Sequence, residues 1–499
     1  MLSKPYTVPL TGKYNTRIAQ SNAAAGTSGI WGVGVWGDFI WGGSNVASGK
    51  DERYVNCMMI TQGDRNYVVK RPGFATNTTP ASGSVGSAVL VWTGQGSGTK
   101  VISAFGGTTS TIYDGTTSLG AITGKAFAIT ETFVSTTATL LISSSDSTAW
   151  YYDTVTAVMT KISDVDFPGN AAKTLAGTFA NLDGYAFIMD TTGALWNSDL
   201  NSVTAWTATS FVSANAYPDK GIGCIRYKNQ IAAFGSESVQ FFYNAGNAVG
   251  SPLLRVDNAT IKIGAINASS LAQIADVLFW VGGSPQGGCT VYMFDGSVQR
   301  ISNPEQDFQL SMAGPDNISL STFRCYGRSF VLVTAEATTY VYCLEDKRWH
   351  EWSTTTPLWF RMAGLSTGTQ VLTYSVSNVS TSGKVFVINP SSLSFQDNAE
   401  AFTATIQSGT VDLNTDNRKF WEELRVVCDI EPSTSTLTVT YSDDDYVTFT
   451  THGTIDISTQ NTKLTRLGSS KRRAWKLTHA SDTQFRLHRL EGRATVGTL

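Results

Sequence analysis

Histidine, the usual acid, base or metal ligand near neutral pH, occurs at only four positions: His350, His452, His479 and His488. None of them stands in an H-E-x-x-H motif or in a triad-like motif. His350 lies in the sequence Arg-Trp-His-Glu-Trp, which predicts packing inside a repeat rather than catalysis. We therefore expect no catalytic residues and a protein that is not an enzyme.

The densest carboxylates are Asp443–Asp445, and clustered carboxylates suit Ca²⁺. Consecutive side chains on a strand point to alternating sides, however, so they reach one ion only where the backbone turns. The stretch Ser442–Phe449 is similar to the Asp-box turn of sialidase-like propellers, with Tyr446 in the place of a Gly. We predict a structural turn here in preference to a metal site.

Gly32, Gly34 and Gly37 satisfy the pattern G-x-G-x-x-G. A dinucleotide site would need a strand before this pattern and a helix after it, and Trp, Val and Phe surround it instead. We therefore expect no cofactor.

The six cysteines form no C-x-x-C pair and are widely spaced, which predicts buried free thiols rather than disulfides or a zinc site.

Trp31, Trp36 and Trp41 lie five residues apart in a Gly-rich segment, a spacing that fits neither a helix face nor strand alternation. Two interpretations stand. The segment is a loop whose tryptophans pack on the protein's own body, or it orders against a neighbouring subunit, since large aromatic residues anchor interfaces. The three tryptophans are thus candidate subunit-interface residues.

A basic tract contains Lys471, Arg472, Arg473 and Lys476. It is a candidate electrostatic contact with an acidic partner subunit or with phosphate. It can equally be an exposed strand edge that Lys and Arg protect from aggregation. We favour an edge or a subunit contact over nucleic acid.

The composition predicts an all-β protein. Charged residues make up only 15% of the 499 positions, whereas there are 46 Gly, 51 Ser and 64 Thr. The aromatic share of 11% argues against disorder. An excess of strand formers with Gly-rich turns is typical of many short strands.

A pattern of three or four strand-like runs recurs roughly every 40 to 50 residues, which is the signature of a β-propeller. Asp114-Gly115 and Asp295-Gly296 stand between strand formers and predict hairpin turns. The seven units are residues 88–123, 132–163, 174–199, 221–246, 276–302, 322–352 and, weaker, 362–389. We predict six or seven blades, with closure that could recruit a strand from the N-terminal region.

The charge pattern changes after about residue 398. Residues 400–456 carry eleven acidic and three basic side chains, whereas residues 463–493 carry nine Lys or Arg and two acidic side chains. Strand-like runs here predict a β-sandwich with Val427, Trp475 and Leu477 facing its core. We thus expect an irregular Gly/Trp-rich N-terminal segment at 1–80, a propeller at 81–397 and a β-sandwich at 398–499.

The N-terminus has no apolar core of a secretory signal, and no run of 18 apolar residues predicts a membrane span. We expect synthesis in a cytoplasm without standard export. The net charge of −3 supplies no global basic field for nucleic acid, so any such contact is local.

Several segments together resemble the packaged-DNA stabilisation proteins, or tail hub (nozzle) proteins, of short-tailed bacteriophages. The resemblance is spread over most of the chain and no single motif is highly specific. The segments that carry it are 52–57, 69–74, 221–226, 234–243, 276–283, 292–296, 441–444 and 472–477.

This resemblance implies a virion protein of the tail, made in the host cytoplasm. It implies a ring of about six copies below the portal and adaptor proteins, with a distal tail protein beneath. Such a ring extends the channel for exiting double-stranded DNA and helps to retain the packaged genome. The family offers no catalytic residues to carry over. The alternative is a glycan-binding or glycan-cleaving propeller that acts as a receptor-binding tail component, although no Arg/Tyr/Glu carbohydrate site stands out in the sequence.

Overall fold

The computed structural model describes residues 4–8, 52–62, 65–96, 98, 100–283, 288–335, 338–353, 360–367, 370–377, 381–389 and 394–497 of the chain. The chain divides into two compact units. Residues 1–73, 350–355 and 392–499 form the sandwich unit, and residues 74–349 and 356–391 form the propeller unit. The predicted division near residues 80 and 397 stays a prediction.

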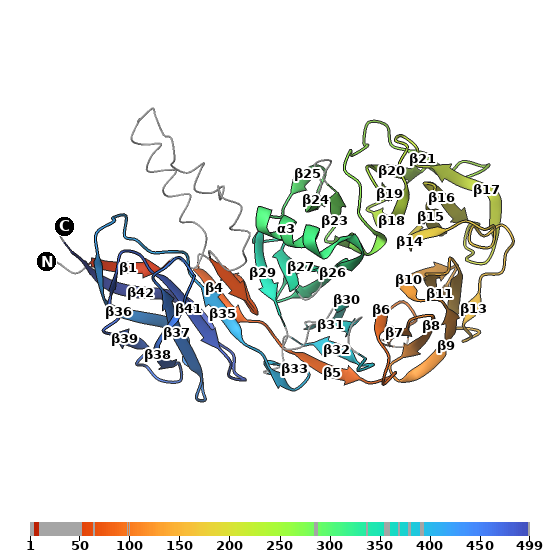
Figure 1. The fold of residues 1–499 in the computed structure, drawn as a ribbon. Coiled ribbons are helices and arrows are strands. Elements are labelled where there is room, and N and C mark those ends of the chain that lie inside the picture. The colour runs from red at the N-terminus through yellow and green to blue at the C-terminus, as the bar shows by residue number, and fades with distance from the viewer. Residues whose placement is uncertain are drawn as a thin grey trace, which may run out of the picture. The chain divides into compact units, whose positions relative to one another are not determined.

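The described part of the propeller unit contains seven groups of four antiparallel strands (Figure 1). Six groups are separate sheets, and the sixth along the chain is part of a nine-stranded sheet. The first four sheets are β6 (Gly86–Trp92), β7 (Lys100–Gly106), β8 (Thr109–Asp114), β9 (Thr117–Thr123); β10 (Ala126–Val134), β11 (Thr137–Ser144), β12 (Ala149–Asp153), β13 (Thr160–Lys161); β14 (Leu175–Leu182), β15 (Tyr185–Asp190), β16 (Ala194–Ser198), β17 (Trp206–Ser213); and β18 (Gly221–Tyr227), β19 (Gln230–Gly235), β20 (Val239–Asn244), β21 (Leu253–Arg255).

The other three sheets complete the set. They are β22 (Leu271–Ile274), β23 (Val277–Gly283), β24 (Cys289–Phe294), β25 (Val298–Arg300); β26 (Ile318–Cys325), β27 (Arg328–Ala335), β28 (Thr338–Cys343), β29 (Arg348–Trp352); and β30 (Phe360–Thr367), β31 (Gln370–Ser377), β32 (Val385–Ile388) with β5 (Phe74–Thr78). The last three residues of β29 count with the sandwich unit.

The sheets are the blades of a closed propeller. The first strands of consecutive blades, β6, β10, β14, β18, β22, β26 and β30, contact one another in turn, and β30 contacts β6. Figure 1 shows the labelled first strands around a common centre. The all-β propeller prediction is confirmed, and the blade number is seven, one for each predicted repeat.

The seventh blade takes its outermost strand from the other end of the propeller sequence. Phe74 and Ala75 of β5 pair with Ile388 and Val387 of β32. Recruitment of an N-terminal strand, which the sequence suggested, is confirmed. Because β5 precedes the first blade and pairs with the last, it fastens the two ends of the ring together.

Buried runs in the middle strands explain why each blade needs its neighbours. In β27, every residue from Ser329 to Ala335 is buried, because blades cover both faces of the sheet. Trp280 of β23 in the fifth blade contacts Phe234 of β19 in the neighbouring fourth blade, with ring centres 5.7 Å apart. Each such large apolar side chain contributes roughly 1.5–3 kcal/mol on burial.

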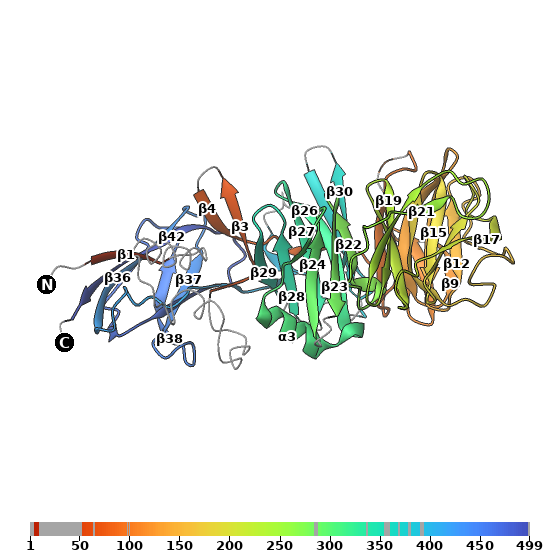
Figure 2. The same cartoon turned by 90° about the horizontal axis from the view of Figure 1, so that it is seen from above.

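Turns and one helix complete the propeller unit. Gly115 and Gly296 have φ values of 60° and 78° in the predicted Asp-Gly hairpins, a conformation that favours glycine. The helix α3 (Pro304–Ala313) begins after Asn303, whose side chain accepts from the backbone N–H of Gln306, and lies at one face of the propeller (Figure 2). The short 3₁₀ turns are η2 (Ala268–Ser270) and η3 (Pro315–Asn317).

The sandwich unit has two sheets over one core. One sheet has the order β3-β4-β42-β36-β39, with β1 on β42 and β40 on β36. The other consists of β2-β35-β41-β37-β38, which continue the nine-stranded sheet from β29. The bounds are β1 (Lys4–Val8), β2 (Arg53–Val55), β3 (Cys57–Gln62), β4 (Arg65–Lys70), β35 (Ala404–Gln407), β36 (Lys419–Cys428), β37 (Thr436–Ser442), β38 (Thr450–Asp456), β39 (Lys463–Thr465), β40 (Ser469–Ser470), β41 (Ala474–His479) and β42 (Arg486–Val496). A separate short pair is β33 (Gln396–Asp397) and β34 (Glu400–Ala401).

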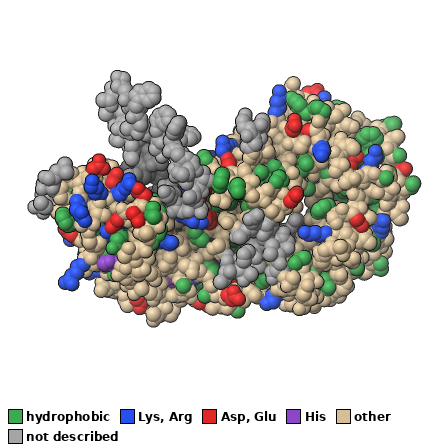
Figure 3. Space-filling view, viewed as in Figure 1, with side chains coloured by type: hydrophobic (Ala, Val, Ile, Leu, Met, Phe, Trp, Pro, Cys, Tyr) green, Lys and Arg blue, Asp and Glu red, His purple; other side chains and the backbone are tan. Residues whose placement is uncertain are grey.

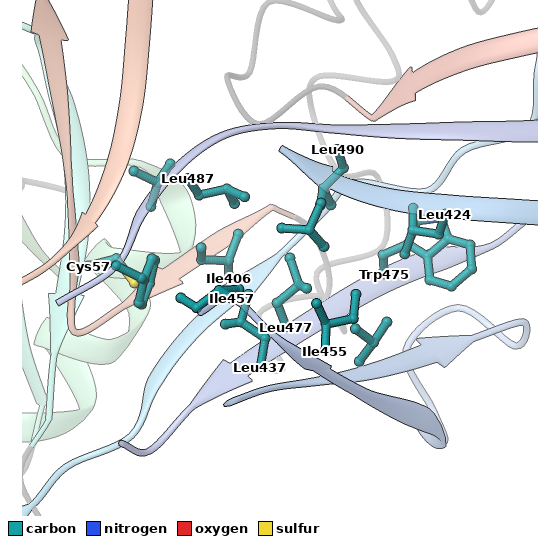
Figure 4. Close-up of a cluster of buried hydrophobic side chains, with 14 of the residues drawn as sticks. Cys57, Ile406, Leu424, Leu437, Ile455, Ile457, Trp475, Leu477, Leu487 and Leu490 are labelled. Carbon is teal, nitrogen blue, oxygen red and sulfur yellow. The ribbon is translucent and has the colours of Figure 1, made fainter. Parts of the chain in front are cut away.

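Side chains from both sheets fill this core (Figure 4). Trp475 and Leu477 of β41 are buried in it, as predicted. Val427 is only half-buried and the prediction for it is wrong, because Val426 is the core residue of β36. A shift of one residue moves a strand side chain to the opposite face.

No helix in the described ranges is long and apolar enough to span a membrane. All six cysteines are free, and all but Cys428 are buried, which confirms the prediction of buried thiols for those five. Burial raises the pKa of the Cys224 and Cys325 thiols to about 12, so these side chains stay protonated at neutral pH.

Candidate functional site

The aspartate run after β37 forms a turn held by hydrogen bonds. Asp444 accepts from the Ser442 hydroxyl at 2.8 Å, from the Thr448 backbone N–H at 2.9 Å and from the Thr448 hydroxyl at 2.6 Å. The hydrogen bonds from Thr448 lower the pKa of Asp444 to about 2. The predicted Asp-box-like turn is therefore confirmed.

The two neighbouring aspartates bind the basic tract of the same chain. Asp443 accepts from Nε and Nη2 of Arg473, both at 2.7 Å, and Asp445 pairs with Arg472. The three carboxylates thus point to three different partners. Part of the opposite charge that the sequence shows in the last hundred residues is neutralised within one chain.

Arg473 is an interior residue of the sandwich unit. Its side chain is 1% exposed, and its guanidinium carbon lies 3.9 Å from the ring centre of Tyr441. It also donates to the carbonyl of Leu467. Because every side of this guanidinium is covered, the expectation that Arg473 contacts a partner does not fit its position.

The other cations of the tract differ in exposure. Lys471 and Arg472 are exposed, whereas Lys476 is half-buried with its ammonium 4.6 Å from the ring centre of Phe449. Burial, with a smaller effect of Arg53, lowers the pKa of Lys476. A contact of Lys471 and Arg472 with another molecule stays a prediction, as does the interface role of Trp31, Trp36 and Trp41, which lie outside the described residues.

A second cationic cluster in the sandwich unit was not predicted from the sequence. Arg71 is fully buried and pairs with Asp397 through Nη1 at 2.9 Å and Nη2 at 2.5 Å. Its Nε donates to Asn56 at 2.9 Å, and its two remaining N–H groups donate to the carbonyls of Pro72 and Ser353. All five guanidinium donors are thus bonded.

Aromatic side chains and a lysine surround this arginine. The Phe402 ring centre lies 3.9 Å from the guanidinium carbon of Arg71 and 4.6 Å from the Lys70 ammonium. Lys70 donates to the carbonyl of Ser481 at 2.8 Å, and burial lowers its pKa to about 8. Asp397 lies 326 positions from Arg71, so local patterns could not reveal the pair.

Two of the histidines, His350 and His479, are buried. His350 is 2% exposed, so it is buried as a packing role requires. Its ring lies edge-on to Tyr54 of the sandwich unit rather than inside a repeat. His479 is buried, and its Nε2 lies 2.8 Å from the Ser435 hydroxyl. Burial, with a smaller effect of Lys70, lowers the pKa of His479 to about 4. Within the described residues, no group of three or more His, Cys, Asp or Glu side chains could hold a metal ion.

A protein-family model matches residues 56–387, a range that includes all seven blades apart from the end of β32. The model is described as the phage stabilisation family, bacteriophage P22 Gp10, β-propeller. The chain belongs to this family. Membership of the phage stabilisation family confirms the resemblance seen in the sequence and makes the chain a phage tail and DNA-stabilisation protein.

No curated protein matches the chain. Solved structures with a similar fold include BamB from Moraxella catarrhalis, with 11% identity and a TM-score of 0.38 over 66% of this chain and 92% of that chain. The extracellular domain of the one component system BT4673 from B. thetaiotaomicron has 12% identity and a TM-score of 0.42, over 79% of this chain and 47% of that chain. Raptor from Chaetomium thermophilum has 12% identity and a TM-score of 0.41, over 65% of this chain and 29% of that chain.

Proposed function

We propose that this protein forms a ring of about six copies in the tail of a short-tailed phage, below the portal and adaptor proteins. The ring extends the channel through which double-stranded DNA leaves, helps to retain the packaged genome and carries a distal tail protein beneath it. Membership of the phage stabilisation family supports a place in the tail. The role is structural and involves no catalysis.

The charge of the propeller unit is the observation that favours a DNA passage over a DNA-binding protein. The unit contains 16 Lys and Arg against 20 Asp and Glu, a net charge of −4. Figure 3 shows isolated charges of both signs on its visible face, among tan and green side chains. Each phosphate that a basic surface neutralises adds to affinity for DNA, so a strongly basic lining would slow ejection.

Sizing of the purified chain with and without a portal–adaptor complex tests the proposal. We expect rings to form on the complex and the free chain to stay smaller. A chain that ignores the complex, or a monomer that hydrolyses surface polysaccharide, would contradict a structural role. A ring with a strongly basic lumen in an electron cryomicroscopy map would contradict the passage model.

A further inference from the structure

A pocket of about 600 Å³ lies where the third and fourth blades present their strand ends. Asp183 comes from the turn between β14 and β15, and Lys228 and Asn229 come from the turn between β18 and β19. Tyr243 and Asn244 end β20. The volume falls in the range of sites that bind small molecules.

Hydrogen bonds orient Asp183 and Asn244 in the lining of this pocket. The Asn244 side chain donates from Nδ2 to Oδ2 of Asp183 at 2.9 Å, and its Oδ1 accepts from the backbone N–H of Gly246 at 2.9 Å. Both the nitrogen and the oxygen of the Asn244 side-chain amide therefore have a hydrogen-bond partner within the protein. The other carboxylate oxygen of Asp183 is left to accept from a ligand.

Further polar groups in the pocket lack hydrogen-bond partners in the protein. These groups are the side-chain amides of Asn229 and Gln230, the Tyr243 hydroxyl and the Lys228 ammonium. No described residue makes a hydrogen bond to any of them. The ammonium lies 5.1 Å from the ring centre of Tyr227. The lining thus offers both donors and acceptors, which suits vicinal hydroxyl groups, since these both donate and accept.

Two tyrosines give the pocket its apolar surface. Tyr227 is 6% exposed and is held by Phe241 and Phe294, whose ring centres lie 5.8 Å and 5.4 Å away. Tyr243 is 39% exposed and stands opposite Gln230 in the β19–β20 ladder. The accessible ring of Tyr243 can pack on the C–H face of a sugar, while the amides bind its hydroxyl groups.

The charges of the pocket favour a neutral ligand over a phosphate. Asp183 and Lys228 contribute one charge of each sign, so the lining has no net charge, and the carboxylate repels an anion. We propose that this pocket binds a neutral saccharide of one or two hexose units. The inference rests on the propeller unit alone and does not depend on the ring or the DNA channel.

Saturation-transfer NMR on the purified full-length chain tests this inference, with cellobiose, maltose, mannobiose and diacetylchitobiose as probes. We expect saturable binding of at least one disaccharide at probe concentrations up to about 10 mM, because weak specific complexes have dissociation constants of about 1 mM or lower. Tyr243→Ala and Asp183→Ala should each weaken that binding about tenfold or more.

Tyr326→Ala is the matched control. Tyr326 is 38% exposed, close to the value for Tyr243, but it lies in the turn between β26 and β27 outside the pocket. We expect this variant to bind like the wild type, and thermal melts should show that all three variants are folded. Absence of saturable binding to every probe, or equal loss in Tyr326→Ala, overturns the inference.

A segment of a second copy of the chain is the other possible occupant, and the same variants distinguish it. If Tyr243→Ala and Asp183→Ala prevent assembly on the portal–adaptor complex and no probe binds, the pocket is a subunit contact and the saccharide site is wrong. If probes bind but the wild type forms no ring, the saccharide site stands and the proposed function fails.

Discussion

A buried guanidinium stabilises a fold only while all its partners are in place. Arg71 contributes five bonded N–H groups inside the sandwich unit, and its carboxylate partner Asp397 is 5% exposed. We expect Arg71→Ala to lower the free energy of unfolding of this unit by roughly 3–5 kcal/mol, because the buried Asp397 then loses its two hydrogen bonds to the guanidinium. Denaturant unfolding measures this loss.

Arg472→Ala provides the comparison for that measurement. Arg472 and Asp445 form an ion pair with side chains 55% and 42% exposed, and exposed pairs contribute at most about 1 kcal/mol. A loss in Arg71→Ala no larger than the loss in Arg472→Ala would show that the buried cluster does not hold the unit together.

His479 gives the sandwich unit a pH dependence. Its pKa is about 4 in the fold against 6.5 as the ordinary value, so between these pH values the unfolded chain binds a proton that the folded chain does not. Stability should therefore fall as the pH is lowered from 6.5 to 4, by roughly 2–3 kcal/mol from this group. Denaturant unfolding at a series of pH values measures the slope.

His479→Gln should remove most of that slope, and His452→Gln at a half-exposed position of β38 should leave it unchanged. The Nε2 of His452 lies 3.2 Å from the carbonyl of Thr465, so the control also replaces a hydrogen-bonded imidazole. An unchanged slope in His479→Gln would assign the pH dependence to other groups.

At the scale of elements, local patterns predicted most of the propeller. Each blade is one hairpin-rich repeat of contiguous sequence, so strand runs and turns such as Asp114-Gly115 identify it without tertiary information. Register was less predictable. β36 has irregular pairing between Trp421 and Glu423, where the buried positions change from Lys419 and Trp421 to Leu424 and Val426. Such a bulge disturbs the alternation from which the inward face is read.

Strand β5 closes the seven-bladed propeller by pairing with β32 of the last blade. We expect Thr76→Pro, opposite Phe386 in the β5–β32 ladder, to loosen the junction of the seventh and first blades, since proline cannot donate to a ladder. Hydrogen exchange should then show faster exchange in β31, β32 and β6. The thermal midpoint of the propeller unit should also fall.

Ala121→Pro in β9 tests whether this effect is specific to closure. β9 is the outermost strand of the first blade and is not supplied from the opposite end of the propeller sequence. We expect faster exchange in β8 and β9 alone. If Thr76→Pro speeds hydrogen exchange only in β5 and β32, the propeller does not need its closing strand to keep the first and seventh blades together.

At the scale of the whole molecule, the sandwich unit was the least predictable part. Its residues come from three stretches of the chain, 1–73, 350–355 and 392–499, and pairs such as Arg53 with Glu351 join positions 298 apart. Composition along the chain cannot show such pairing. The charge pattern of residues 400–493 likewise suggested a partner, whereas Asp443 and Asp445 in fact neutralise two of the arginines internally.

Lys471 and Arg472 are the exposed cations of the basic tract, and Arg472 pairs with Asp445. Reversal of both charges in Lys471→Glu with Arg472→Glu should reduce assembly on the portal–adaptor complex about tenfold or more, because like charges then oppose an acidic partner surface. Lys463→Glu, at an exposed position of β39, changes the net charge in the same direction and should assemble normally. Native mass spectrometry of the mixtures measures the assembled fraction. If the double variant assembles normally, Lys471 and Arg472 do not contact a partner subunit, and their role is to protect a strand edge. If it assembles normally but binds DNA more weakly than the wild type, phosphate is their partner.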